Sequence, residues 1–184
     1  MWVALTGTPG TGKSSVATLL QKQGYTIVQL HQLARENKCI DGIDKKRNSQ
    51  LIDIDKLNKS IKKHFTKDAL VFFEGHVGHL LKTMDKVIIL RCHPKELKKR
   101  LTKKKWSNKK NKENLDAETI DVILCETIDQ HPQKNVFEID TINKTIQEVA
   151  TIIINIVKKN FQPTKTYTIG QIDWLEEIFK EYPA

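Results

Sequence analysis

The stretch GTPGTGKS at residues 7–14 decides the fold, because it has the Gly-x-x-x-x-Gly-Lys-Ser pattern of a phosphate-binding loop. A short apolar run at residues 2–6 precedes it, and residues 13–23 carry apolar side chains at helical spacing. Glycines let such a loop curl until its backbone N–H groups point at phosphate oxygens, and the following helix adds its positive dipole end. The order of strand, loop and helix therefore predicts a P-loop that binds ATP.

Each part of this loop has an expected task in binding ATP and Mg²⁺. Lys13 is expected to bridge the β and γ phosphates, and Ser14 to coordinate Mg²⁺. The hydroxyl of Ser15 can donate one further hydrogen bond. The loop residues predicted to bind ATP are Gly10, Thr11, Gly12, Lys13, Ser14 and Ser15.

The length and composition of the chain favour a single cytoplasmic domain. With 184 residues the chain can bury a core without disulfides or metals. Its three cysteines show no Cys-x-x-Cys spacing, which gives little support to a disulfide framework or a zinc site. No signal pattern precedes the P-loop, and the apolar run at 149–157 is far shorter than the roughly 20 residues that span a bilayer. We therefore expect no membrane association.

The net charge of +9 is concentrated in one segment of the chain. Residues 95–112 contain ten Lys or Arg and one acid, a surplus of nine that accounts for the whole net charge. A basic block of this kind can bind polyphosphate or RNA, and it can equally be the solvated face of a helix. The sequence leaves both interpretations open.

The rest of the chain alternates between β-type and helical patterns. Such alternation predicts an α/β fold with a parallel sheet and helices on both faces. The five predicted strands are residues 2–6, 26–30, 70–74, 86–90 and 136–139. Between or after them, helices are predicted at about 13–23, 30–36, 55–65, 94–104, 114–130 and 145–160.

The chain after residue 160 has a different character. Residues 162–170 contain proline, glycine and threonine without periodicity, which indicates a linker. The segment after it has Ile172, Leu175, Ile178 and Phe179 along one helical face. We therefore expect residues 1–160 to form the P-loop domain and residues 161–184 to form a linker and a helix. That helix either packs back on the domain, which we favour, or binds a partner.

Among P-loop proteins, the sequence favours the small-molecule kinases. The chain has neither the Asp-x-x-Gly switch nor the Asn-Lys-x-Asp guanine-reading motif of translational-type GTPases. A motor ATPase or a helicase would need far more chain than follows the fifth predicted strand. Kinases of nucleotides or of other small acceptors remain.

The sequence resembles the family of adenylate kinase isoenzyme 6, also called the coilin-interacting nuclear ATPase, together with its archaeal relatives. The resemblance covers most of residues 2–160. It is carried by LTGTPGTGKS at 5–14, LARE at 33–36, DG at 41–42, IDID at 52–55, EGH at 74–76, IILR at 88–91, and RL at 100–101 ahead of KKW at 104–106.

This resemblance implies a fold and a set of activities. The fold would be that of a nucleoside monophosphate kinase, with a five-stranded parallel core, a monophosphate-binding insert and a lid. The implied activities are phosphate transfer from ATP to AMP or related monophosphates and slow ATP hydrolysis. The resemblance also implies a role in late maturation of the small ribosomal subunit and its rRNA, through transient binding of the small-subunit protein uS11.

The resemblance also implies positions for the substrate-binding parts. The monophosphate-binding region corresponds to about residues 30–53 and the lid to about residues 103–113. Arg35 takes the place of the monophosphate-binding arginine, and Asp53 falls in the same substrate-binding region. The sequence departs from the family at Gln32, where the family has Asp, and at Lys104, where the family has a lid arginine. Lysine keeps the positive charge but loses the planar fork that grips phosphate at two points.

Phosphoryl transfer depends mainly on positioning and on neutralising phosphate charge, so cations should surround the site. The chain has only four arginines against 27 lysines. We expect Arg35 to bind AMP, and Arg100 and Lys104 to bind ATP and stabilise the developing charge. Arg91, at a strand end, is either structural or a phosphate contact. Glu74 ends a strand next to the expected Mg²⁺ site, where a carboxylate commonly holds a metal-bound water.

Two histidines follow Glu74 closely. His76 and His79 have no third ligand at suitable spacing, which argues against zinc. In the resembled family the histidine of the acid-x-His motif supports ATP hydrolysis, and this role falls on His76. No role is assigned to His79 or His131.

Three functions remain open at this stage. The first is a broad-specificity nucleoside monophosphate kinase with ATPase activity. The second is an ATPase switch in ribosome assembly whose kinase activity is incidental. The third, a P-loop kinase of another small acceptor such as shikimate, is least favoured because of the LARE match at 33–36.

Overall fold

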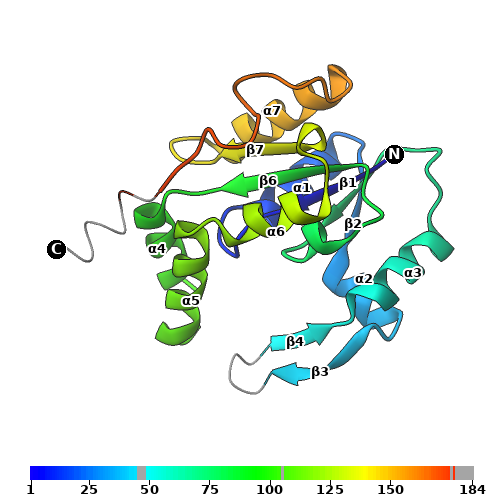
Figure 1. The fold of residues 1–184 in the computed structure, drawn as a ribbon, viewed down its shortest axis with the longest axis horizontal. Coiled ribbons are helices and arrows are strands. Elements are labelled where there is room, and N and C mark those ends of the chain that lie inside the picture. Colours follow the sequence, from blue (N-terminus) through cyan, green and yellow to red (C-terminus); the bar gives the residue numbers. More distant parts are fainter. Residues whose placement is uncertain (45–48, 105, 175, 177–184) are drawn as a thin grey trace.

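The computed structural model describes residues 1–44, 49–104, 106–174 and 176. Its centre is a sheet of five parallel strands in the order β2-β5-β1-β6-β7 (Figure 1). The strands are β1 (Trp2–Thr6), β2 (Thr26–Gln29), β5 (Val71–Glu74), β6 (Lys86–Arg91) and β7 (Val136–Asp140). These are the five predicted strands, and the predicted five-stranded parallel sheet is confirmed.

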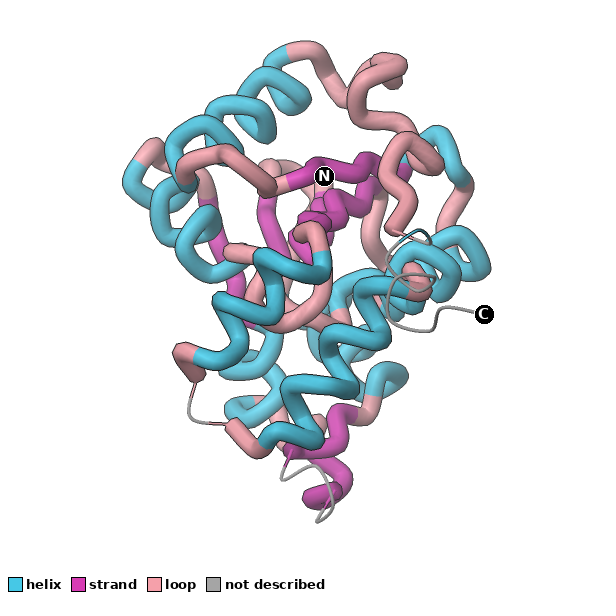
Figure 2. The backbone as a smooth tube through the Cα atoms, turned by 90° about the vertical axis from the view of Figure 1, so that its left-hand side faces the viewer, coloured by secondary structure: helices cyan, strands magenta, loops and turns pink. Residues whose placement is uncertain are grey.

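Side chains on alternate positions of the strands pack under helices on opposite faces of the sheet. Val3 and Leu5 of β1 belong to the core cluster that includes α1 (Lys13–Lys22) and α7 (Ile146–Lys158). Trp2 and Ala4 belong to the cluster on the other face. That face is covered by α2 (Leu30–Glu36), α3 (Ile54–His64) and α6 (Val122–Gln130). Figure 2 shows the helices surrounding the central strands.

A two-stranded antiparallel hairpin projects beside α2 and α3, away from the main sheet (Figure 1). It consists of β3 (Ile40–Asp44) and β4 (Ser49–Ile52). The sequence did not predict these strands, because they are short and largely polar and lack the apolar run of a buried strand. They lie within the region predicted to bind the monophosphate. Residues 45–48, with Arg47, lie outside the described part of the chain.

The helix predicted over residues 114–130 is wrong in one respect, because two helices occupy this part of the chain. α5 (Asn108–Thr119) is followed by its C-cap residue Ile120, and α6 begins after Asp121, whose backbone is left-handed with φ 58°. The Asp121 carboxylate accepts a hydrogen bond from the guanidinium of Arg91. A tertiary contact therefore stabilises the break, and the local apolar pattern could not reveal it.

α4 (Pro94–Thr102) and α5 form a second projection from the domain. They pack through a small apolar cluster of Cys92, Leu97 and Leu101 with Trp106 and Leu115. The predicted lid region, 103–113, comprises the connection between these helices and the first turns of α5; Lys105 lies outside the described residues. Two short 3-10 turns, η1 (Gly78–Leu80) and η2 (Gln133–Asn135), complete the described elements.

The predicted linker at 162–170 has neither helix nor strand and runs beside β7. The backbone N–H of Glu138 donates to the Tyr167 carbonyl at 3.0 Å, and the N–H of Gly170 donates to Glu138 Oε2 at 2.9 Å. Trp174 contacts the ring of His93, with centroids 4.9 Å apart. Most of the predicted terminal helix lies outside the described residues, which do not include 175 and 177–184.

Across the described part of the chain, no helix has the length and apolar character needed to cross a membrane.

Candidate active site

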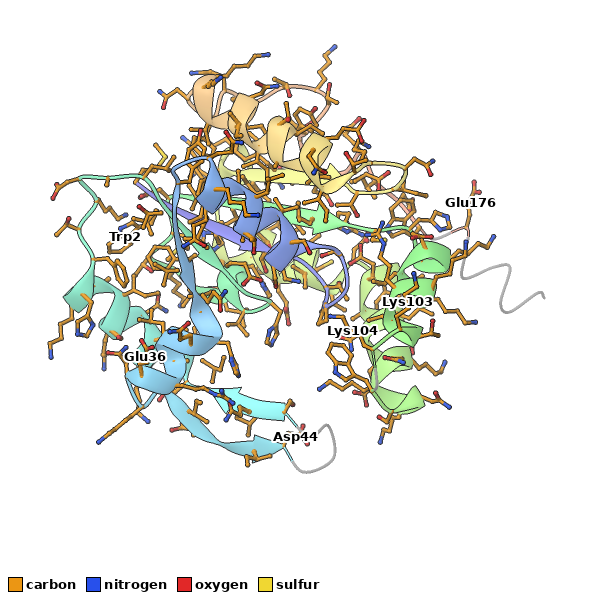
Figure 3. All side chains as sticks on the ribbon, turned by 180° about the vertical axis from the view of Figure 1, so that it is seen from behind. Trp2, Glu36, Asp44, Lys103, Lys104 and Glu176 are labelled. Atoms are coloured by element: carbon orange, nitrogen blue, oxygen red, sulfur yellow. The ribbon has the colours of Figure 1, made fainter. Side chains whose placement is uncertain are left out.

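A cavity of about 1210 Å³ opens at the carboxyl ends of the central strands, where parallel α/β sheets bind their ligands. Its walls come from the P-loop, α2, the β3–β4 hairpin, the loop after β5, and α5 with the residues before it. Figure 3 shows the two projections on either side of this space, with Asp44 labelled on the hairpin and Lys104 near α4. The predicted site residues that line the cavity are Gly10, Gly12, Lys13, Ser14, Ser15, Arg35, Glu74, His76 and Lys104.

The P-loop has the backbone conformation that its glycines predict. Gly12 has φ 105°, in the left-handed region that favours glycine, and an added Cβ there would meet no atom within 4 Å. Gly7 also has a positive φ of 138°, and a Cβ there would lie 2.3 Å from the Leu90 carbonyl oxygen. Thr11 lies behind the loop, where its buried hydroxyl donates to the Thr8 carbonyl at 2.9 Å and does not line the cavity.

Lys13 is a buried cation at the floor of the cavity. Its Nζ donates to the carbonyl oxygens of Gly7 at 2.6 Å and Thr8 at 3.0 Å. Burial lowers the pKa of Lys13 to about 8, although the charges of Glu74 and Glu118 oppose this shift. At neutral pH the ammonium is therefore mostly charged and can bind phosphate oxygens.

Ser14 and Glu74 form a pair suited to holding Mg²⁺. The Ser14 hydroxyl donates to Glu74 Oε1 at 3.1 Å, which places two hard oxygen ligands side by side. Among the described residues, no group of three or more His, Cys, Asp or Glu could cage a metal ion. This arrangement fits Mg²⁺, which usually takes one or two protein oxygens and completes its shell with phosphates and water.

His76 faces the cavity from the loop after β5. Desolvation by the cavity walls, followed by the charge of Lys13, lowers the pKa of His76 to about 4. The ring is therefore neutral at physiological pH, and one of its nitrogens can accept a hydrogen bond. This is the state needed to orient a water molecule.

His79 supports the loop that carries His76. The buried ring lies with Nδ1 3.3 Å from Thr6 Oγ1 and with Nε2 2.8 Å from Glu126 Oε2. The His79 carbonyl oxygen lies 2.8 Å from Nε2 of the buried His131. Burial lowers the pKa of both rings. These two histidines therefore join η1 to β1 and α6, which a sequence without an alignment could not reveal.

On the hairpin side, Arg35 lines the cavity together with His31 and Gln50. Asp53 does not line it. Its side chain instead caps the first turn of α3, where it accepts a hydrogen bond from the Lys56 N–H at 2.9 Å and pairs with Lys56 Nζ at 3.0 Å. These hydrogen bonds lower the pKa of Asp53. The structure therefore places Asp53 as the cap of α3 and outside the lining of the cavity.

On the lid side, two ammonium groups lie over one aromatic ring. Nζ of Lys104 is 4.6 Å and Nζ of Lys110 is 4.9 Å from the centre of the Trp106 ring, and all three residues line the cavity. Arg100 does not line it: its guanidinium pairs with Glu96 at 3.2 Å and donates to Thr141 Oγ1 at 3.3 Å. Of these two residues, which the sequence grouped, Lys104 therefore lines the cavity and Arg100 does not.

Behind the P-loop, Arg91 is fully surrounded by acceptors. Its guanidinium pairs with Glu118 at 2.9 Å, with Glu138 at 2.5 Å and with Asp121. Glu118 also accepts hydrogen bonds from the hydroxyl of Thr8 in the P-loop and, at 3.0 Å, from the Cys92 N–H. Arg91 therefore has a structural role, the first of the two that the sequence left open. No local signal pointed to Glu118.

Comparisons with known proteins find relatives over nearly the whole chain. A family model described as an AAA domain matches residues 3–121. A protein of Archaeoglobus fulgidus named "Putative adenylate kinase" is 42% identical, over 97% of this chain and 94% of its own length. Proteins with the same name from Pyrococcus abyssi and Methanocaldococcus jannaschii are 39% and 35% identical, over 98% and 97% of this chain and 94% and 96% of their own lengths.

Solved structures of small-molecule kinases share the fold. The thymidylate kinase of Candida albicans superposes with a TM-score of 0.55 at 13% identity, covering 86% of this chain and 91% of that chain. The shikimate kinase of Acinetobacter baumannii superposes with a TM-score of 0.56 at 16% identity, covering 86% of this chain and 93% of that chain.

Proposed function

The chain belongs to the family of these archaeal adenylate kinase relatives, and on this premise we propose that it is a nucleoside monophosphate kinase that converts ATP and AMP to two ADP. The observation that carries the proposal is that Lys13, from the P-loop side, and Arg35, from α2, line one and the same cavity. A cation on each side is what transfer between two phosphate-bearing substrates requires. We also propose a slower ATPase activity at the same site.

On the donor side, the chain binds and orients the triphosphate. The P-loop N–H groups and Lys13 hold the β and γ phosphates, and the N-terminus of α1 adds its positive dipole end. Ser14 and Glu74 are the residues that would hold Mg²⁺. When bound, this ion neutralises phosphate charge.

On the acceptor side, Arg35 binds the phosphate of the monophosphate. Ile43 and Leu51 of the hairpin also line the cavity and are 62% and 51% exposed, so they are available to contact the sugar and base. Lys104 approaches from the lid side as a point charge for the transferred group. The neutral ring of His76 accepts a hydrogen bond from water and so supports hydrolysis when no monophosphate is bound.

A product-resolved assay tests this proposal. With Mg²⁺ and ATP, the purified protein is expected to form ADP rapidly when AMP is present and to release free phosphate slowly when it is absent. Phosphate release that is indifferent to every nucleoside monophosphate would support an ATPase switch instead. ADP formation that requires a different small acceptor would identify another kind of P-loop kinase.

In the same assay, His76→Ala is expected to reduce phosphate release more than AMP phosphorylation. The ring is neutral and faces the cavity, so its loss removes a water-orienting acceptor but no phosphate-binding charge. His64→Ala is the matched control, because His64 lies at the exposed end of α3. An equal loss of both activities in His76→Ala would count against a role in hydrolysis.

A second candidate function is a role in maturation of the small ribosomal subunit and its rRNA through binding of uS11, as the family resemblance implies. The basic surplus of residues 95–112 supports contact with RNA. Changing Lys109, Lys110 and Lys112 together to Glu is then expected to abolish a salt-dependent affinity for small-subunit rRNA fragments. Unchanged RNA binding in a filter or anisotropy titration would remove the RNA part of this proposal.

A further inference from the structure

A polar contact joins α2 to the hairpin at the edge of the cavity. Oε1 of Gln50, on β4, lies 3.2 Å from Nε of Arg35 and 2.9 Å from Nε2 of His31. All three side chains line the cavity. The contact connects residues 15 and 19 positions apart in the chain, so only the hairpin's return past α2 brings them together.

The chemistry of the donors fixes how the Gln50 amide is oriented. The guanidinium of Arg35 can only donate, so the Gln50 atom facing Nε must be the carbonyl oxygen. His31 Nε2 then donates to the same oxygen and carries a proton. The side-chain oxygen of Gln50 therefore accepts from two donors. The NH₂ group of Gln50 has no hydrogen-bond acceptor among the described residues.

Arg35 differs from the other described arginines in the charge of its partners. Arg91 pairs with three carboxylates, and Arg100 pairs with Glu96. Among the described residues, Arg35 has no carboxylate partner. Its guanidinium donates instead to the neutral amide of Gln50. Since the contact uses only Nε, the two terminal nitrogens of the guanidinium keep their hydrogen-bonding capacity and the group keeps its full charge.

We propose that Gln50 is a positioning residue that orients the Arg35 guanidinium for the phosphate of the monophosphate substrate without neutralising it. This inference rests on the proposed function, which makes Arg35 the acceptor-side cation. A neutral acceptor at Nε restricts rotation of a long side chain before substrate arrives, which reduces the entropy lost on binding. The terminal nitrogens then meet the dianionic phosphate with the paired geometry that only a guanidinium provides.

The decisive variant is Gln50→Glu. It keeps the size and an acceptor for Arg35, but the new carboxylate competes with the phosphate for the guanidinium. The KM and the Kd for AMP are expected to rise about tenfold, with kcat and the KM for ATP within about twofold of the unmodified protein. Gln50→Met, which has similar volume but no acceptor, is expected to raise the KM for AMP several-fold. Gln147→Glu adds the same charge on the exposed surface of α7 and is the matched control.

A double-mutant cycle shows whether Gln50 acts through Arg35. Arg35→Met is expected to raise the KM for AMP, and adding the neutral Gln50→Met to it should cause no further increase, because the residue being positioned is gone. Independent, additive effects would overturn the inference, and so would a Gln50→Glu protein whose Kd for AMP is unchanged.

Binding measured by calorimetry separates this inference from the proposed function. If the unmodified protein binds AMP but forms no ADP, the proposed kinase activity fails, while the Kd values of the variants still decide the role of Gln50. If the unmodified protein does not bind AMP, both are overturned. If it transfers phosphate normally and Gln50→Glu binds AMP as tightly as before, only the inference fails.

Discussion

Replacing Lys13 with Met is expected to lower the rate of ADP formation by about 10²–10³-fold or more, because the change removes the cation that faces the transferred phosphate. Lys13 is buried at the cavity floor, and solvent cannot replace its charge there. The measurement is the initial rate of ADP formation at saturating AMP. Lys22→Met, at the exposed far end of α1, is the matched control and should leave the rate unchanged.

The pH dependence of the same reaction gives an independent check. Burial depresses the Lys13 pKa to about 8, so in the free protein the ammonium loses its proton as pH rises through this value. Only the protonated form attracts phosphate, and kcat/KM for ATP should therefore fall above about pH 8. The Lys13→Met protein should lack this alkaline decline. If the decline were the same in both proteins, another group would be responsible.

Replacing Arg91 with Met is expected to lower the free energy of unfolding by about 3–5 kcal/mol. The substitution leaves the carboxylates of Glu118 and Glu138 buried without their cation, and Asp121 loses the contact that accompanies the break between α5 and α6. The surrounding carboxylates raise the Arg91 pKa despite its burial, so the guanidinium stays charged over the whole working range of pH. Urea unfolding followed by circular dichroism measures the change.

Arg100→Met is the matched control for this stability experiment. Arg100 is partly exposed and pairs with Glu96 on the same helix, so its loss should cost no more than about 1 kcal/mol. Equal destabilisation by the two substitutions would show that the buried network around Arg91 contributes little. Because Glu118 also accepts from Thr8, Arg91→Met should in addition loosen the P-loop and weaken ATP binding.

The fold was predictable because its signals are local. Each strand of the parallel sheet is a short apolar run, and each predicted helix shows its own periodicity. The part of the resemblance that concerns archaeal relatives, carried by contiguous motifs, is confirmed by the archaeal proteins named "Putative adenylate kinase". The hairpin was missed because its strands are short and largely polar, and the break at Asp121 was missed because it depends on Arg91, 30 positions away.

The candidate site was predictable where its chemistry is contiguous. A P-loop presents neighbouring backbone N–H groups to its ligand, so the spacing of Gly12, Lys13 and Ser14 alone is enough to predict where the loop lies. Arg35 and His76 were placed by family motifs, and the structure brings both to the cavity. Arg100 and Asp53 were also predicted from family motifs. In the structure, Arg100 instead forms an ion pair with Glu96, and Asp53 instead caps α3.

Periodicity and glycine spacing act over a few neighbouring residues, so the sequence was enough to predict the parallel sheet, most of the helices around it and the phosphate loop. The surroundings of the described arginines, in contrast, came from contacts between distant parts of the chain. Arg91 is engaged by carboxylates 27 to 47 positions away, whereas Arg35 meets a neutral amide across the hairpin. The charge available to a ligand depends on what surrounds the side chain in space, and a pattern along the chain does not contain that information.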